Sequence, residues 1–198
     1  MDIDSAFKSE VFRPIVTLAV PGSIVIGPYI LIVKFYFPSV NAFWNDHSSA
    51  FVAIVAVVVL AVGLILENLG SMIECDVLDE MIERKDNVHR SKWNEYLKLE
   101  VKDEIIGQRY LRTILTRMKF ELSMIPALFF FWCGLLWMNR LNGIWRTSRF
   151  ILMSGIIFIL MAVMFLEAYR SAKNTAKTRA LIIEAVKARP PTQKKELG

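Results

Sequence analysis

The sequence alternates between long apolar runs and shorter polar segments. Four runs of 17 to 19 residues carry at most one charged residue each. A helix that crosses a bilayer needs about 20 mostly apolar residues, because the hydrocarbon layer is about 30 Å thick. A buried helix of a soluble bundle would have a polar face, whereas a run such as FVAIVAVVVLAVGLIL is apolar on every side. The pattern predicts four membrane-spanning helices, at residues 14–36, 50–75, 119–139 and 149–169.

Polar segments flank and separate these predicted spans. A tail is expected at residues 1–13, and short outer loops are expected at 37–49 and 140–148. Residues 76–118 carry nine acidic and nine basic residues, with apolar residues at helical spacing, which predicts a cytoplasmic helical hairpin. Residues 170–198 begin with strong helix formers, which predicts a basic helix and tail. The predicted fold class is an all-α integral membrane protein with helical cytoplasmic extensions.

Lys and Arg are concentrated on one side of the predicted spans. Twenty of the 24 lie in the N-terminal tail, the long connector and the C-terminal segment. Loops rich in Lys and Arg stay in the cytoplasm. The sequence therefore predicts that both termini are cytoplasmic (N-in and C-in), and we expect a multi-pass protein of the bacterial inner membrane.

Composition adds little chemistry to this topology. Hydrophobic residues make up 55% of the 198, which is more than a soluble core requires, so a soluble enzyme is not expected. Cys75 and Cys133 are predicted to lie about 20 Å apart in depth, too far for a disulfide. No metalloprotease, hydrolase or nucleotide-binding motif is present. We therefore predict no catalytic residue, no metal site and no cofactor.

The first predicted span contains two proline–glycine pairs, Pro21-Gly22 and Gly27-Pro28. Each proline removes a backbone donor and crowds the preceding turn, so this helix is expected to kink or unwind locally. Such breaks are tolerated where the freed carbonyl groups are buried in protein or line a cavity. Two interpretations are open: an ordinary proline-bent helix, or a gate beside a cavity.

Three glutamates are predicted to lie at one depth. Counting helical rise along each span places Glu67, Glu121 and Glu167 near the cytoplasmic edge of the hydrocarbon. Arg117 precedes Glu121 by four residues and Arg170 follows Glu167 by three, which are pairing distances on a helix. One interpretation is interfacial acids that pair locally or reach water. The other is an ion or proton pathway, or a divalent-cation site.

A polar seam follows one face of the second span. At 100° per residue, one narrow sector contains Gly63, Glu67, Gly70, Ser71 and Glu74. Small residues allow close helix approach in lipid, so Gly63 and Gly70 are expected to pack this face against the bundle or a subunit partner. The fourth span has a similar stripe, made of Glu167, Ser171, Asn174 and Thr178. The candidates for an ion pathway or polar seam are Glu67, Ser71, Glu74, Glu121 and Glu167.

The segment from Ala168 onward carries eight basic and two acidic residues, a net charge of +6. Anionic lipid headgroups attract such segments, so we expect this segment to bind the bilayer surface. Nucleic-acid binding is not expected, because no base-reading or stacking motif accompanies the charge.

These features favour a non-enzymatic membrane subunit. We expect it to form a homo-oligomer and to couple the membrane to a soluble cytoplasmic partner. Such subunits occur in bacterial anti-phage defence systems, so we expect, by association only, that this chain belongs to one. The alternative is a small oligomeric ion channel or proton-linked transporter whose conduit passes the three glutamates beside the kinked first span.

Overall fold

Every element that the structure describes is helical. The computed structural model describes residues 3–83, 96, 106–143 and 145–187. Its elements are α1 (Ile3–Tyr36), α2 (Pro38–Asp46), α3 (Ser48–Ile73), the π-helical turn η1 (Glu74–Leu78), α4 (Asp79–Glu83), α6 (Ile106–Asn142) and α7 (Thr147–Lys187). Four helices are long and apolar enough to cross a membrane, α3 being continued through η1 and α4 in its span. This result confirms the prediction of an all-helical chain with four candidate spans and supports a multi-pass membrane protein.

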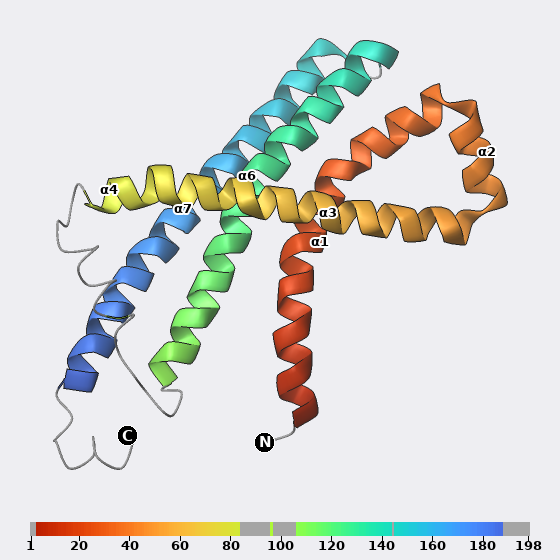
Figure 1. The fold of residues 1–198 in the computed structure, drawn as a ribbon. Coiled ribbons are helices and arrows are strands. Elements are labelled where there is room, and N and C mark those ends of the chain that lie inside the picture. The colour runs from red at the N-terminus through yellow and green to blue at the C-terminus, as the bar shows by residue number, and fades with distance from the viewer. Residues whose placement is uncertain (1–2, 84–95, 97–105, 144, 188–198) are drawn as a thin grey trace.

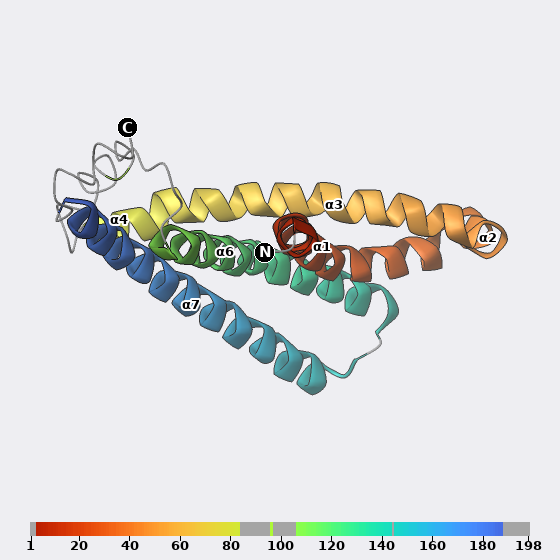
Figure 2. The same ribbon diagram turned by 90° about the horizontal axis from the view of Figure 1, so that it is seen from below.

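Helix α6 is central to the bundle. It packs against α1, α3 and α7, and 50% of its most apolar stretch is buried, compared with 6% in α7. Figure 2 shows α3 and α7 on opposite sides of α1 and α6. Both α3 and α7 keep large apolar side chains exposed along their lengths, as lipid contact requires.

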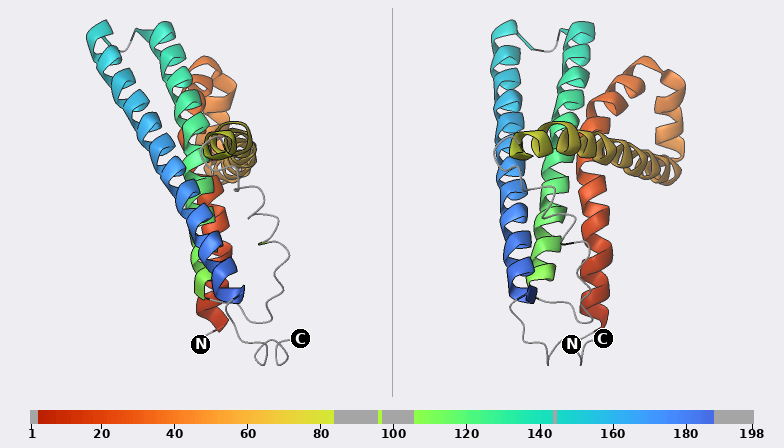
Figure 3. Two further views of the ribbon diagram at one scale, coloured as in Figure 1. Left: turned by 90° about the vertical axis from the view of Figure 1, so that its left-hand side faces the viewer. Right: turned by 60° about the vertical axis from the view of Figure 1, so that its left-hand side comes forward.

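The start of α1 and the end of α7 lie together at one end of the bundle (Figures 1 and 3), called the terminal end below. At the other end, the hydroxyl of Tyr36 in α1 lies 3.4 Å from Oδ1 of Asn142 in α6. Helix α1 therefore runs the same way as α6 between the two ends of the bundle. Figures 1 and 3 show α3 lying across both of these helices rather than along them.

Helices α6 and α7 continue well past the spans that the sequence predicts. Helix α6 begins at Ile106, within the segment expected to form the hairpin, and α7 ends at Lys187, within the segment expected to form the basic helix. In the added part of α6, Leu111, Ile114 and Met118 are buried, at 3%, 9% and 2% exposure, and Leu115 is partly buried. The two helices therefore stay packed against each other through apolar side chains toward the terminal end. The core cluster there comprises Leu78, Ile82, Met118, Leu122, Ala168 and Ala172.

The π-helical turn η1 changes the rotation of α4 relative to α3. The N–H of Asp79 donates to the carbonyl of Glu74, five residues earlier. The extra residue rotates everything after it by about 100° relative to a regular α-helix. After this turn Leu78 and Ile82 are buried, at 0% and 9% exposure, whereas Met81 is 38% exposed.

The first expected outer loop, at residues 37–49, contains the short helix α2. Pro38 occupies its first turn, where a missing N–H costs nothing, so the chain forms a helix there. No residue of α2 is buried, and the Nζ of Lys34 lies 4.3 Å from the ring centre of Trp44. The second expected loop is short: α6 ends at Asn142 and α7 begins at Thr147.

Gly143 ends α6 with a left-handed backbone. Its φ is +58°, and its N–H donates to the carbonyl of Asn139 at 2.8 Å. Glycine adopts this conformation without the steric cost that a side chain adds. The expected turn of the hairpin within residues 76–118, and the residues after 187, lie outside the described part of the chain.

Candidate functional site

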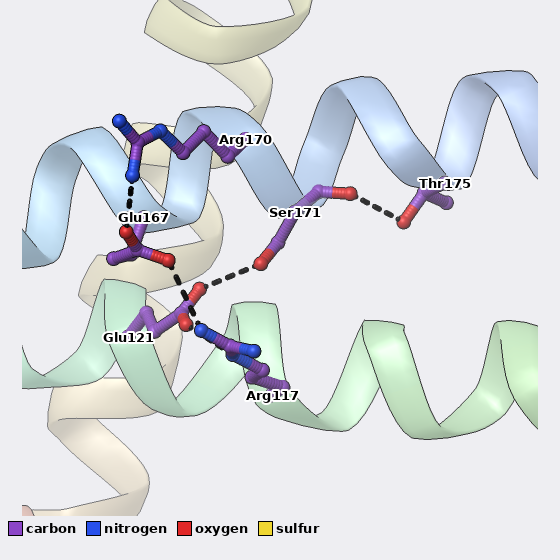
Figure 4. Close-up of polar contacts among 6 residues, drawn as sticks. All are labelled: Arg117, Glu121, Glu167, Arg170, Ser171 and Thr175. Carbon is purple, nitrogen blue, oxygen red and sulfur yellow. Dashed lines mark hydrogen bonds and ion pairs between the residues drawn. The ribbon is translucent and has the colours of Figure 1, made fainter.

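The buried carboxylate of Glu121 anchors a polar network between α6 and α7. Its side chain is 6% exposed. The Nε of Arg117, one turn earlier in α6, donates to Oε1 of Glu121 at 2.7 Å. The hydroxyl of Ser171 in α7 donates to Oε2 at 2.9 Å (Figure 4). Both oxygens of this buried acid therefore have donors, which is what a charge at low dielectric requires.

Glu167 of α7 lies between two guanidinium groups. Nη2 of Arg117 donates to its Oε2 at 3.0 Å, and Nη1 of Arg170 donates to its Oε1 at 2.7 Å. Arg117 therefore bridges Glu121 of its own helix and Glu167 of the neighbouring helix (Figure 4). The arginine side chains are 63% and 71% exposed, so the cations lie outward and the acids inward.

The network continues along α7 through two buried hydroxyl residues. Ser171 is 6% exposed and Thr175 is completely buried. The hydroxyl of Thr175 donates to the backbone carbonyl of Ser171 at 2.9 Å, one turn back (Figure 4). This hydrogen bond satisfies a buried polar side chain without a partner from another helix.

Glu67 belongs to a separate pair on another face of α6. Nζ of Lys119 donates to its Oε1 at 3.3 Å, which joins α6 to α3. Lys119 follows Arg117 by two residues, so the two cations point to nearly opposite sides of α6. The structure thus connects Glu121 with Glu167 through Arg117 and assigns Glu67 to the α3 side. Ser71 and Ser123 donate to backbone carbonyls one turn back, at 3.1 and 2.7 Å.

Glu74 lies where α3 passes into the π-helical turn. It is partly buried, and its carboxyl group interacts electrostatically with Asp79, Lys119 and Arg179. Lys119 therefore acts on two of the seam acids, Glu67 and Glu74, from the α6 side.

The glycines of the seam bring α3 onto its neighbours within the same chain. A Cβ added to Gly63 would overlap the backbone of Leu18 in α1. A Cβ added to Gly70 would lie 3.0 Å from the backbone of Leu122 in α6. The sequence allows this face to meet either the bundle or a subunit partner, and in the structure α1 covers Gly63 and α6 covers Gly70.

The proline–glycine pairs of α1 also contact neighbouring helices. Pro21 and Gly22 are buried, and a Cβ on Gly22 would overlap the carbonyl of Val59 in α3. Pro28 is buried against α6, with its Cβ 2.9 Å from a Cβ built on Gly134, whereas Gly27 is exposed. Helix α1 bends where it crosses α3 (Figure 1) and stays helical throughout. The bend therefore accompanies tight packing at these residues.

Each of the three glutamates predicted to lie at one depth forms an ion pair with a basic side chain. Glu67, Glu121 and Glu167 each accept from a lysine or arginine at 2.7 to 3.3 Å. Among the described residues, no group of three or more His, Cys, Asp or Glu side chains is placed to hold a metal ion. The arrangement joins three helices at one level and neutralises the acids that it buries.

Two features of this site have no signal in the sequence. The spacing indicates the pairs within one helix, Arg117–Glu121 and Glu167–Arg170, and both are present. The contact of Arg117 with Glu167 and that of Lys119 with Glu67 join residues 50 and 52 positions apart. Only the packing of α6 alongside α7 and the crossing of α6 by α3 (Figure 1) create them.

Comparison of the chain with protein-family models, with curated proteins and with solved structures finds no match.

Proposed function

We propose that this chain is a non-enzymatic multi-pass membrane subunit, with both termini in the cytoplasm, that oligomerises and couples the membrane to a cytosolic partner. The observation that carries this proposal is the length and pairing of α6 and α7. These helices have 37 and 41 residues, or about 55 and 60 Å, roughly twice the hydrocarbon thickness. The excess is a packed helical pair at the terminal end, which is long enough to present a surface to a soluble protein.

The charge asymmetry supports the proposed orientation. The terminal end carries the exposed cations Arg112, Arg170, Lys173 and Lys177, and segments rich in Lys and Arg remain cytoplasmic. The bacterial inner membrane and an anti-phage defence system are the proposed setting, by association with small membrane subunits that work with a cytosolic protein.

The pairing of the acids favours a subunit over the alternative of a channel or proton-linked transporter. A cation conduit needs carboxylates that can bind and release the ion. Here Glu121 and Glu167 share Arg117, and Glu67 has Lys119. A lysine or arginine paired with each acid repels an incoming cation.

Flux and assembly, measured together, test this proposal. The purified chain and the Glu67→Gln variant are reconstituted in liposomes for proton and potassium flux, and their mass is measured in detergent by light scattering. We expect an oligomer with no flux above empty liposomes, for both proteins. If the parent protein conducts ions, and Glu67→Gln abolishes this flux while the oligomer stays intact, the subunit proposal is wrong and the chain is a channel. A monomeric parent would contradict the proposed oligomer.

A second measurement tests the cytosolic partner. A photo-crosslinking side chain at Lys177, which is exposed at the terminal end, is compared with the same group at Arg149, which is exposed at the other end. In native membranes we expect a specific cross-linked soluble protein from position 177 and none from position 149. Equal products at both positions would contradict coupling through the terminal end.

A further inference from the structure

One face of α7 changes from apolar to basic along its length. At 100° per residue, a sector about 100° wide contains first apolar and then basic side chains. The apolar members are 45% to 68% exposed, and the basic members are exposed as well. In order along the helix they are Leu152, Ile156, Ile159, Val163, Leu166, Arg170, Lys173 and Lys177.

The cations of this face begin at the depth of the headgroups. Leu166 is the last exposed apolar residue before them, at 54% exposure. Arg170 and Lys173 follow it by about 6 and 10 Å along the axis. The headgroup layer on each side of a bilayer is roughly 5 to 8 Å thick, so both side chains reach it.

The ion-pair network brings a second guanidinium group to the same place. Arg117 of α6 and Arg170 of α7 both donate to Glu167, at 3.0 and 2.7 Å, and both are mostly exposed (Figure 4). A guanidinium has five N–H donors, and the bond to Glu167 engages only Nη1 of Arg170. Two guanidinium groups and a lysine one turn away therefore face outward beside an exposed apolar track.

We propose that this face of α7, with Arg117 beside it, is a binding site for an anionic phospholipid. Its phosphate contacts Arg170, Lys173 and the outward side of Arg117, and its acyl chains lie along the apolar track above them. Charge complementarity selects an anionic headgroup, because phosphate accepts charge-assisted hydrogen bonds from guanidinium groups. The adjoining exposed apolar track selects a lipid over a soluble phosphate. Basic sites between spanning helices on the cytoplasmic side bind lipid headgroups in the same way. The inference requires only that α7 crosses the membrane and is independent of the proposed subunit function.

The test compares two double variants that each remove two positive charges, one variant at the proposed site and the other at the start of α7. Arg170→Gln with Lys173→Gln removes the site but leaves Arg117 on Glu121 and Glu167, so the buried acid keeps its cation. Arg146→Gln with Arg149→Gln is the matched control, because both residues are exposed at the opposite end of α7. Native mass spectrometry of the full chain in detergent measures bound phosphatidylglycerol and phosphatidylcholine.

We expect the parent to prefer phosphatidylglycerol, and we expect Arg170→Gln with Lys173→Gln to weaken its binding about tenfold. The control pair should change it less than about twofold. Equal weakening by both double variants, or by neither, would overturn the site. Displacement of the lipid by millimolar glycerol 3-phosphate would also overturn it, since the site would then bind a soluble phosphate. Unchanged thermal midpoints confirm that the variants remain folded.

Discussion

Gly22 of α1 and Gly63 of α3 lie at the point where their two helices touch backbone to backbone. A Cβ on Gly22 would lie 3.2 Å from the amide nitrogen of Gly63 and would overlap the carbonyl of Val59. A Cβ on Gly63 would overlap the carbonyl of Leu18. The contact leaves no room for a methyl group on either helix. It therefore fixes where α3 crosses α1.

We expect Gly63→Ala and Gly22→Ala each to destabilise the protein. The new methyl group meets backbone, which cannot rotate away, so the cost should reach or exceed the 1–3 kcal/mol or so of an overpacked core. Thermal unfolding in detergent measures the loss as a fall in midpoint of several degrees.

Gly27→Ala is the matched control on α1. A Cβ there has nothing within 4 Å, and alanine is a better helix former than glycine by up to about 1 kcal/mol. Its midpoint should stay equal or rise. A fall as large as that of Gly22→Ala would show that flexibility of α1, rather than its contact with α3, is what the glycines supply.

Arg117 and Arg170 should differ in their importance to stability although both bind Glu167. Arg117→Gln leaves the buried Glu121 without its cation but with the Ser171 donor, so we expect a loss of about 1–3 kcal/mol. Arg170→Gln removes an exposed contact, worth about 1 kcal/mol or less. Chemical denaturation in detergent compares the two.

The double variant Arg117→Gln with Glu121→Gln separates charge from packing. It removes the uncompensated carboxylate, so it should recover much of the stability that Arg117→Gln alone loses. No recovery would mean that Arg117 stabilises the bundle through its contact with Glu167 or through its aliphatic stem instead.

The pair of Lys119 and Glu67 should contribute little to stability. Their nitrogen and oxygen lie 3.3 Å apart, with the side chains 51% and 34% exposed. A double-mutant cycle with Lys119→Gln and Glu67→Gln should give a coupling energy below about 1 kcal/mol. Coupling well above that value would indicate that lipid, rather than water, surrounds the pair.

The proposed topology predicts a labelling pattern for two exposed positions. In a Cys75→Ser, Cys133→Ser background, Arg146→Cys should react with a membrane-impermeant maleimide added to intact cells, because residue 146 is expected outside. Lys177→Cys should react only after the membrane is opened. The reversed pattern would contradict the N-in, C-in orientation, and labelling of both in intact cells would contradict a sealed span between them.

The sequence alone determined the number of candidate spans and the local ion pairs. Uninterrupted apolar runs need no tertiary information to be identified, because the length of a span is set by the bilayer. Pairs such as Arg117–Glu121 follow from helical periodicity within one segment. The long continuous helices α6 and α7 also follow from apolar residues at helical spacing beyond the runs.

Only the tertiary structure decided which helix meets which. The bridge from Arg117 to Glu167 and the contact of Gly22 with α3 depend on how separate helices cross, and no spacing along one chain encodes that. The π-helical turn at Glu74–Leu78 also changes the register between α3 and α4. One extra residue in a helical turn does not change the spacing of apolar residues detectably in so short a segment. The turn is therefore visible only in the three-dimensional structure.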